Sequence, residues 1–290
     1  MDESIKYCHL NLESGRSFFF DHVHIVWNEQ ITIHQSDAWE LSYILKGSGT
    51  RVLGNTVEIF TSGEVIFIPP NIPHGWYFDE FDHDEEGKIE NITIIFDEKL
   101  LDRCVAGFPE TDAFIGKLKE YKQAVKFEGN TLKSIQKIMT KMLVQSDMEQ
   151  LASLFVLFTK IARAEELQVV SNFKNQNKGT EKMQEVSRFM VHNSHRKISL
   201  DEVAQYVGMN RSSFCTFYKR EKGKSFFSAL NEYRIECSCV MLRETAKSIA
   251  EICYAVGFDD IPYYNRTFKK LKGQSPKDYR GRTQIQHQSD

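Results

Sequence analysis

The sequence predicts an α+β protein in which a β-rich N-terminal part is followed by helices. Three observations support this prediction: short β-prone runs fill residues 17–97, apolar residues take helical spacing from about residue 98, and an internal repeat lies within residues 181–290. A length of 290 residues fits two domains. Hydrophobic residues make up 41% of the chain and charged residues 27%, which excludes a mainly disordered or collagen-like protein.

Residues 1–97 are predicted to form the first domain, a β-sandwich or β-barrel. Turn sequences such as TSGE and PPNIP separate its β-prone runs, which are HVHIVW, ELSYIL, TRVLG, VIFIP and ITIIF. Many short strands at regular spacing are typical of these two architectures.

Residues 98–170 are predicted to be helical and to hold two copies of the chain together. Their apolar residues exceed what packing on one small barrel requires, and they include Ile135, Ile138, Met142, Leu151, Phe155 and Phe158. The alternative is that these side chains pack within one protomer. Residues 171–180 (SNFKNQNKGT) are polar, so we expect a linker there.

Residues 181–290 are predicted to form an all-helical domain that contains the internal repeat. Residues 199–208 match residues 248–257 at an offset of 49. At an offset of 50, four further residues recur: Lys219, Lys222, Gly223 and Ser225 match Lys269, Lys272, Gly273 and Ser275. Eight identities in the same order are difficult to attribute to chance.

Each copy of the repeat has the pattern of a helix-turn-helix motif. Ser199 and Ser248 each precede a glutamate by three residues, which predicts a capping box. Gly208 and Gly257 end the first helices, because the turn there needs a positive φ. The second helices contain the aromatic pairs Phe214/Tyr218 and Tyr264/Phe268. Two such motifs, joined by a helix over about 228–244, fit adjacent major-groove segments; the alternative is two ordinary helical hairpins.

Charge is distributed unevenly along the chain. The net charge is −3, but residues 178–290 contain 20 lysines and arginines against 13 aspartates and glutamates, a net charge of +7. The preceding residues contain the remaining 17 basic and 27 acidic side chains, a net charge of −10. One explanation of this asymmetry is a random distribution of charged residues. The other is that the two domains have different partners, and the basic domain suits DNA.

The sequence also predicts the compartment of the protein. It contains six cysteines with no CxxC pair, and its N-terminus is polar, without the apolar core of a signal peptide. The longest apolar stretch, residues 151–162, is too short to span a bilayer. We therefore expect a cytoplasmic protein with reduced thiols and no membrane segment.

The C-terminal residues resemble the DNA-binding domain of AraC/XylS-family transcription regulators. The matching blocks are SIAEI at 248–252, VGF at 256–258, YYNRTFKK at 263–270, GQSP at 273–276 and YR at 279–280. Two residues depart from the family pattern. Pro262 stands where a serine N-cap is usual, and Tyr264 stands where phenylalanine is usual. We expect the helix to tolerate Pro262, because a proline near the first helical position removes an N–H that has no intrahelical partner.

The β-rich N-terminal part resembles, more weakly, a cupin-like β-barrel that serves as a sensor domain; the matching residues are His34, Glu40, Gly47, Gly63, Pro69 and His74. Together the resemblances imply a sequence-specific regulator, with activation favoured, in which a small-molecule effector in the barrel controls binding to double-stranded DNA. They also imply a homodimer and RNA polymerase as a partner. They imply no cofactor and no catalytic residue.

Two alternatives remain open. One is a cupin-type metalloenzyme with a helical appendage, and the other is a regulator whose N-terminal domain only dimerises. The sequence contains no P-loop, GxGxxG, GxSxG or HExxH motif, so an enzyme hypothesis rests on the incomplete cupin set alone.

The resemblance assigns DNA contacts to the second helix of each motif. In the first motif it assigns base contacts to Ser212, Cys215 and Thr216 and phosphate contacts to Arg211 and Lys219. In the second motif the candidates are Tyr263, Asn265 and Arg266 for base edges or the DNA backbone, and Lys269 and Lys270 for phosphates. For each residue the alternative is a solvated position on an exposed helix face.

The candidate effector site combines polar and aromatic residues of the N-terminal part: His34, Trp39, Glu40, Tyr43, His74 and Trp76. Two imidazoles and a carboxylate suit a hydroxylated organic molecule such as a sugar or a sugar acid. The alternative is that they are structural residues. Metal-binding cupins use a second histidine where this chain has Ser36, so we assign no metal here, although three ligands can hold one.

Overall fold

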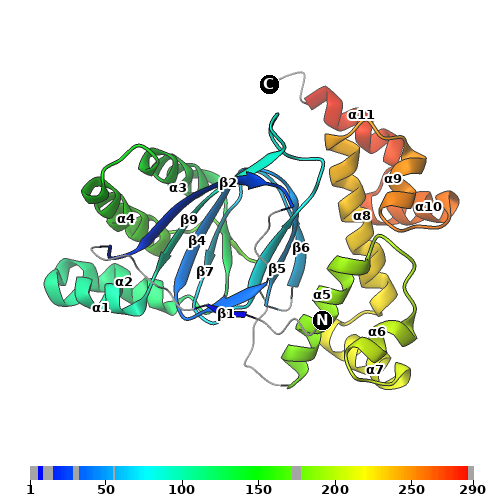
Figure 1. The fold of residues 1–290 in the computed structure, drawn as a ribbon, viewed down its shortest axis with the longest axis horizontal. Coiled ribbons are helices and arrows are strands. Elements are labelled where there is room, and N and C mark those ends of the chain that lie inside the picture. Colours follow the sequence, from blue (N-terminus) through cyan, green and yellow to red (C-terminus); the bar gives the residue numbers. More distant parts are fainter. Residues whose placement is uncertain (1–5, 9–15, 29–32, 55, 172–177, 287–290) are drawn as a thin grey trace. The chain divides into compact units, whose positions relative to one another are not determined.

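The computed structural model describes residues 6–8, 16–28, 33–54, 56–171 and 178–286 (Figure 1). The chain divides into two compact units. The N-terminal unit comprises Met1–Thr56 and Phe60–Phe173, and the C-terminal unit comprises Val57–Ile59 and Lys174–Asp290. Most of the expected linker at 171–180 lies outside the described residues, and a helix begins at Lys178.

Two β-sheets form the framework of the N-terminal part. One has the strand order β1-β3-β8-β5-β6 and the other β11-β10-β7-β4-β9-β2. The strands of the first sheet are β1 (Lys6–Cys8), β3 (His34–Ser36), β8 (His74–Phe78), β5 (Gly49–Leu53) and β6 (Thr56–Phe60). Those of the second are β11 (Leu167–Val169), β10 (Val125–Phe127), β7 (Val65–Ile68), β4 (Trp39–Lys46), β9 (Lys88–Phe96) and β2 (Phe19–Val26).

The α+β class is confirmed, but the closed barrel is not. Within the described residues the strands remain in two separate sheets, each with its own edge strands. Apolar side chains from both sheets meet between them, among them Leu53 of β5 and Ile66 and Ile68 of β7. This arrangement is a sandwich, which buries the inner faces of both sheets without closing the strand order into a ring.

Helices cover the other face of the six-stranded sheet (Figure 1). They are α1 (Glu98–Gly107), the 3₁₀ turn η1 (Pro109–Thr111), α2 (Asp112–Glu120), α3 (Gly129–Met142) and α4 (Asp147–Ala162). The segment 98–170 is thus not purely helical, because it also supplies β10 and β11. Val125 of β10 pairs with Phe67 of β7, so the segment returns to extend the sheet. None of the described helices has the length and apolar character needed to span a bilayer.

The apolar residues expected to join two protomers pack largely inside one unit. Ile135, Met142 and Phe158 are fully buried in the core between the sheet and its helices. Ile138, Leu151 and Phe155 are partly buried against the same core. Packing within a single protomer therefore accounts for much of the apolar spacing in α3 and α4.

The C-terminal unit contains helices α5 to α11. They are α5 (Lys178–Asn193), α6 (Leu200–Tyr206), α7 (Arg211–Lys222), α8 (Phe226–Glu244), α9 (Ile249–Ala255), α10 (Ile261–Lys272) and α11 (Pro276–Gln286). The two copies of the repeat form the pairs α6–α7 and α9–α10, with α8 between them in the sequence. This confirms the prediction of two helix-turn-helix motifs joined by a helix.

Candidate nucleic-acid interface and ligand site

Local sequence fixes both ends of α7, the second helix of the first motif. Asn210 is its N-cap, and the Asn210 side chain accepts a hydrogen bond from the Ser213 backbone N–H at 2.8 Å. Gly223 ends the helix in the left-handed conformation, with φ of 70°. Phe214, Phe217 and Tyr218 are buried in the core of the unit. The opposite face of α7 is therefore free to bind a partner.

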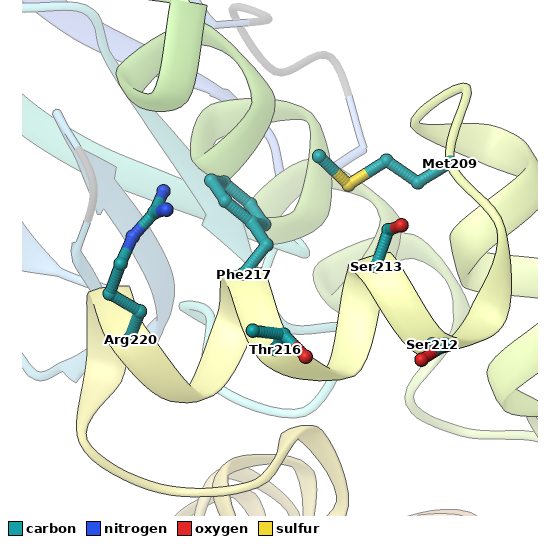
Figure 2. Close-up of a pocket in the computed structure, with 6 residues that line it drawn as sticks. All are labelled: Met209, Ser212, Ser213, Thr216, Phe217 and Arg220. Atoms are coloured by element: carbon teal, nitrogen blue, oxygen red, sulfur yellow. The ribbon is translucent and has the colours of Figure 1, made fainter.

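All five residues predicted to contact DNA in the first motif are exposed; they are Arg211, Ser212, Cys215, Thr216 and Lys219. An open cavity of about 390 Å³ lies along this helix, and its lining residues are Met209, Ser212, Ser213, Thr216, Phe217 and Arg220. Figure 2 shows Ser213, Phe217 and Arg220 in a row along α7, with Met209 beside them. Arg220 was not among the predicted contact residues, although its spacing could have revealed it, since it follows Thr216 by one helical turn.

The α10 helix of the second motif begins at Ile261 and tolerates Pro262 near its first position, as expected. Asp260 is the N-cap, and its carboxylate accepts a hydrogen bond from the Tyr263 backbone N–H at 2.6 Å. Pro262 is the second residue of the helix and not its cap, so its missing N–H leaves no hydrogen bond unmade. Tyr264 is also accounted for, because its hydroxyl lies 3.0 Å from the buried Ser238 hydroxyl, within hydrogen-bonding distance.

The predicted contact residues of α10 also lie at its surface. Tyr263, Arg266, Lys269 and Lys270 are exposed and Asn265 is half-buried. The Tyr263 hydroxyl accepts a hydrogen bond of 2.8 Å from the Asn231 amide, which holds its ring toward α8. An open cavity of about 410 Å³ lies beside α10, lined by Ile249, Asn265, Arg266, Lys269, Ser275, Pro276 and Lys277.

The two cavities differ in chemistry. At the offset of 50, Thr216 of the first motif corresponds to Arg266 of the second, and Cys215 corresponds to Asn265. At these two positions the first motif therefore offers small neutral side chains, whereas the second offers a guanidinium and a carboxamide. At these two positions, only the second motif has groups that can form bidentate hydrogen bonds with a base edge.

In the N-terminal unit, three predicted ligand-site residues come together from three strands. His34 of β3, Glu40 of β4 and His74 of β8 each place a ligand atom within 4.8 Å of the others. His74 Nε2 lies 3.1 Å from Glu40 Oε2, and the rings of His34 and His74 are 4.3 Å apart. Glu40 is 7% exposed and His74 is 2% exposed, so this polar cluster lies inside the sandwich.

Burial and charge act in opposite directions on this pair. Burial raises the pKa of Glu40, but the charge and the hydrogen bond of His74, together with the charge of His34, outweigh it, so the pKa lies below its ordinary value. Burial lowers the pKa of His74, and the charge and hydrogen bond of Glu40 raise it above its ordinary value. Both directions favour a carboxylate with a positive charge beside it.

The aromatic residues of the predicted effector site lie in two different places: Trp76 is beside the cluster, and Trp39 and Tyr43 are on the helix-covered side of the six-stranded sheet. Trp76 lies beside the cluster, with its ring 5.5 Å from that of His74. Trp39 instead stacks on Phe67, 5.5 Å away, in the core beneath the helices, and Tyr43 packs against the same core. Adjacent strand residues point to opposite faces, so Glu40 and Trp39 cannot serve one pocket. Trp39 and Tyr43 therefore lie on the opposite face of β4 from Glu40, apart from the His34–Glu40–His74 cluster.

Comparison with known proteins assigns the chain to a family. A family model described as an AraC-like ligand binding domain matches residues 25–158, and one described as a helix-turn-helix domain matches residues 203–282. The chain belongs to the AraC family. Members of this family are transcription regulators and not enzymes, so the metalloenzyme alternative is set aside.

Several relatives of this AraC-family chain have names. The MmsAB operon regulatory protein of Pseudomonas aeruginosa is 31% identical over 32% of this chain and 31% of its own length. An uncharacterized HTH-type transcriptional regulator of Staphylococcus aureus is 33% identical over 35% of this chain and 14% of its own length. The chain thus spans less than a third of the length of these curated relatives.

Two solved structures are also similar. A transcriptional regulator of Chromobacterium violaceum, described as containing an AraC-type DNA-binding domain, is 28% identical over 37% of this chain and 96% of its own, with a TM-score of 0.35. ToxT of Vibrio cholerae is 16% identical over 91% of this chain and 98% of its own, with a TM-score of 0.39.

Proposed function

We propose that this AraC-family protein is a sequence-specific DNA-binding transcription regulator, acting as an activator in the cytoplasm. The observation that best supports the proposal is the repeated helix-turn-helix pair. Each copy has its aromatic pair buried and a polar face exposed on its second helix, in a part of the chain that is rich in basic residues. A double-stranded operator with two adjacent major-groove segments is the ligand that fits this repeat.

The exposed faces of α7 and α10 make different kinds of contact with DNA. Arg266 and Asn265 read base edges, and Thr216, Ser212 and Cys215 make weaker base contacts, because a guanidinium or amide forms paired hydrogen bonds and a hydroxyl does not. The cations at the ends of these faces contact phosphates; they are Arg211, Lys219, Lys269 and Lys270.

Titration against operator DNA selected from a random pool tests this division. Arg266→Ala is expected to weaken specific binding by about 10-fold or more and leave non-specific binding nearly unchanged. Lys269→Ala is expected to weaken both equally and to reduce the salt slope by about one. Lys133→Ala, an exposed lysine of α3, is the matched control. Equal losses for Arg266→Ala and Lys269→Ala would contradict the assignment of the base-reading face.

The ligand is a small polar organic molecule, with a sugar or a sugar acid as the best match, bound between the sheets near His34, Glu40, His74 and Trp76. Buried imidazole and carboxylate groups need polar partners, and a hydroxylated molecule supplies both donors and acceptors. Thermal shift against a panel of sugars and sugar acids tests this, with Glu40→Gln as the binding-site variant and Glu80→Gln as the control. A molecule that binds must also change the affinity of the protein for DNA, by about 5- to 150-fold if the two sites are coupled to the usual extent.

The protein acts as a homodimer through the exposed face of α4. Four large apolar side chains there and nearby remain exposed: Met148 by 75%, Val156 by 46%, Val144 by 88% and Phe108 by 59%. Met148 and Val156 are two helical turns apart and share one face. Sedimentation of wild type as a dimer and of Met148→Glu/Val156→Glu as a monomer would support this interface. Wild type that sediments as a monomer with and without DNA would contradict it.

The remaining partner is RNA polymerase, which the protein contacts in order to activate transcription. A reporter gene behind the selected operator measures it directly: expression that rises with the protein identifies an activator, and expression that falls identifies a repressor.

A further inference from the structure

We propose that His34, Glu40 and His74 bind one divalent first-row transition-metal ion. This inference rests on the proposed ligand-binding role of the N-terminal unit, and it names the group that anchors the organic ligand there. Three strands supply the three ligand atoms, all within 4.8 Å of one another. His34 and His74 are direct partners in the pairing of β3 with β8, so strand register fixes their proximity.

The hydrogen bonds of His74 define which ring nitrogen faces the cluster. Nδ1 lies 2.8 Å from the carbonyl oxygen of Ile72, and a carbonyl only accepts, so Nδ1 carries a proton. Nε2 then points at Glu40 Oε2 at 3.1 Å. A histidine whose second ring N–H donates to a backbone carbonyl is the usual arrangement of a metal ligand, because that bond fixes the tautomer and the ring orientation.

The short distance between His74 and Glu40 requires a positive species between them. The lone pair of a neutral Nε2 and that of a carboxylate oxygen repel at 3.1 Å, so either a second proton or a metal ion must separate them. Two ligands of a tetrahedral zinc ion lie about 3.3 Å apart, given bond lengths of about 2.0–2.2 Å. A metal ion would also bind His34, whereas a proton on His74 Nε2 forms a hydrogen bond with Glu40 only.

The donor set selects the class of ion. Two imidazoles and one carboxylate are the ligands of zinc in open sites and of ferrous iron in facial triads, and hard Ca²⁺ and Mg²⁺ prefer oxygen ligands. Ser36, at the position of a fourth ligand in the sequence pattern, instead accepts a hydrogen bond from the Ala38 N–H at 3.1 Å. The protein therefore supplies three ligands and leaves coordination positions open.

An open position explains how one small cluster can hold an organic effector. An oxygen of a hydroxy acid or sugar acid binds the ion directly, as substrates do in three-ligand metal sites. The Trp76 indole N–H is a second feature of the same surroundings. It is buried and has no hydrogen-bond partner among the described residues, and its ring adjoins that of His74. It is the donor available to an acceptor oxygen of that ligand.

Calorimetry on the full chain, after removal of metal with a chelator, tests the proposal with Zn²⁺ as the probe. Co²⁺ serves as a second probe, because its visible absorption reports four- or five-coordinate nitrogen and oxygen ligation. Wild type is expected to bind one ion per chain. Glu40→Gln and His34→Ala are expected to bind more than about 100-fold more weakly, since loss of an outer-shell contact alone costs 10- to 100-fold.

Two controls exclude other metal-binding residues. His22→Ala removes an exposed histidine that pairs with Glu90 at 2.7 Å, and Cys215→Ser removes an exposed thiol; both are expected to retain wild-type affinity. Melting temperatures show whether each variant is folded, and His34, being half-buried, offers a variant that leaves the buried pair intact. Wild type that binds no stoichiometric metal, or equal affinity in wild type and folded His34→Ala, would overturn the proposal.

DNA and effector titrations on the same samples separate this inference from the proposed function. Effector binding and a DNA response in metal-free protein would refute the metal ion as the anchor of the effector and leave the regulator intact. Stoichiometric metal bound at these residues, with no affinity for any selected DNA, would support the metal site and refute the regulator.

Discussion

The two helix-turn-helix motifs use the same turn glycine under different constraints. Gly208 has φ of +63°, and a Cβ placed there meets nothing closer than the Lys182 Nζ at 3.8 Å. Gly257 has φ of +92°, and a Cβ there would lie 2.2 Å from the Ser194 carbonyl oxygen and 2.9 Å from Arg234 Nη2. The first motif needs glycine only for its backbone conformation. The second needs it also because the end of α5 packs directly against the turn.

The largest expected effect comes from adding a methyl group at the two turns. Gly208→Ala is expected to destabilise the C-terminal unit by about 1–2 kcal/mol, the cost of a left-handed alanine. Gly257→Ala adds a clash with backbone that no side-chain rotation relieves, so we expect a loss of about 4 kcal/mol or more. Urea unfolding followed by circular dichroism at 222 nm measures both.

Tryptophan fluorescence is an internal control for this comparison, because Trp27, Trp39 and Trp76 are the three tryptophans of the chain and all belong to the N-terminal unit. Its transition should be unchanged in both variants. Equal losses for the two alanine variants would mean that the junction at Gly257 relaxes freely.

Arg234 of α8 is the second part of this junction. It is buried, and it donates from Nε to the Ser194 carbonyl at 2.8 Å and from Nη2 to the Arg196 carbonyl at 2.6 Å. Its guanidinium lies over the Phe258 ring, 5.7 Å from the centroid. Arg234 thereby connects residues that precede the first motif to Phe258, which follows the turn glycine of the second.

Replacing Arg234 by methionine, which retains much of the apolar volume, is expected to cost about 2–3 kcal/mol, because two carbonyls lose charge-assisted hydrogen bonds. The same measurement on Arg211→Met provides the control. That exposed arginine lies 3.4 Å from Asp201, and such surface pairs contribute little, so we expect a change below about 0.5 kcal/mol. Similar losses in the two variants would show that the buried contacts do not stabilise the junction.

The difference between the two turns marks the limit of what the sequence could predict. Local patterns identified both motifs, both turn glycines and both aromatic pairs, since caps and positive φ depend on neighbouring residues. The clash at Gly257 depends on Ser194, more than sixty residues away, and no local pattern encodes that contact. The N-cap at Asp260 was missed for another reason: the family pattern drew attention to Pro262, although aspartate is itself a favoured N-cap.

In the N-terminal unit, the polar cluster was predictable and its aromatic surroundings were only partly so. His34, Glu40 and His74 were grouped from the resemblance, and strand pairing places them together. Trp39 and Tyr43 were grouped with them because they are close in sequence. The period of two in a strand places Trp39 and Glu40 on opposite faces of β4, so closeness in sequence did not predict closeness in space. Two sheets instead of a barrel could not be inferred, because both have the same strand pattern.

The aromatic pairs of the two motifs offer a smaller test. Tyr264 places its hydroxyl 3.0 Å from the hydroxyl of Ser238, which is 0% exposed, whereas the corresponding residue of the first motif is Phe214. Tyr264→Phe leaves the Ser238 hydroxyl buried without this partner, so we expect a loss of about 1–2 kcal/mol. Adding Ser238→Ala should recover part of that loss in the urea measurement. Tyr254→Phe, at an exposed tyrosine, should change nothing; a comparable loss there would remove the buried hydrogen bond as the explanation.

The smallest expected difference concerns the first turn of each motif. Ser248 and Glu251 form the complete capping box: the Glu251 N–H donates to Ser248 Oγ at 3.2 Å, and the Ser248 N–H donates to Glu251 Oε2 at 2.7 Å. Ser199 accepts from the Glu202 N–H at 3.1 Å, but the Glu202 carboxylate bonds instead to Arg196. The hydrogen bond of Ser248 lowers the pKa of Glu251, and the hydrogen bond of Arg196 lowers the pKa of Glu202.

A carboxyl whose pKa is lowered on folding stabilises the native state above its unfolded pKa, and that contribution is lost as the pH falls through the folded value. Glu202→Gln and Glu251→Gln should therefore each lower the melting temperature slightly at pH 7 and less at pH 3. Salt distinguishes them, because an exposed ion pair is screened and a hydrogen bond to a backbone N–H is affected less. In 1 M NaCl the effect of Glu202→Gln should shrink while that of Glu251→Gln persists. If both effects shrink alike, the two glutamates act mainly through their charge, and the capping boxes of the two motifs do not differ in solution.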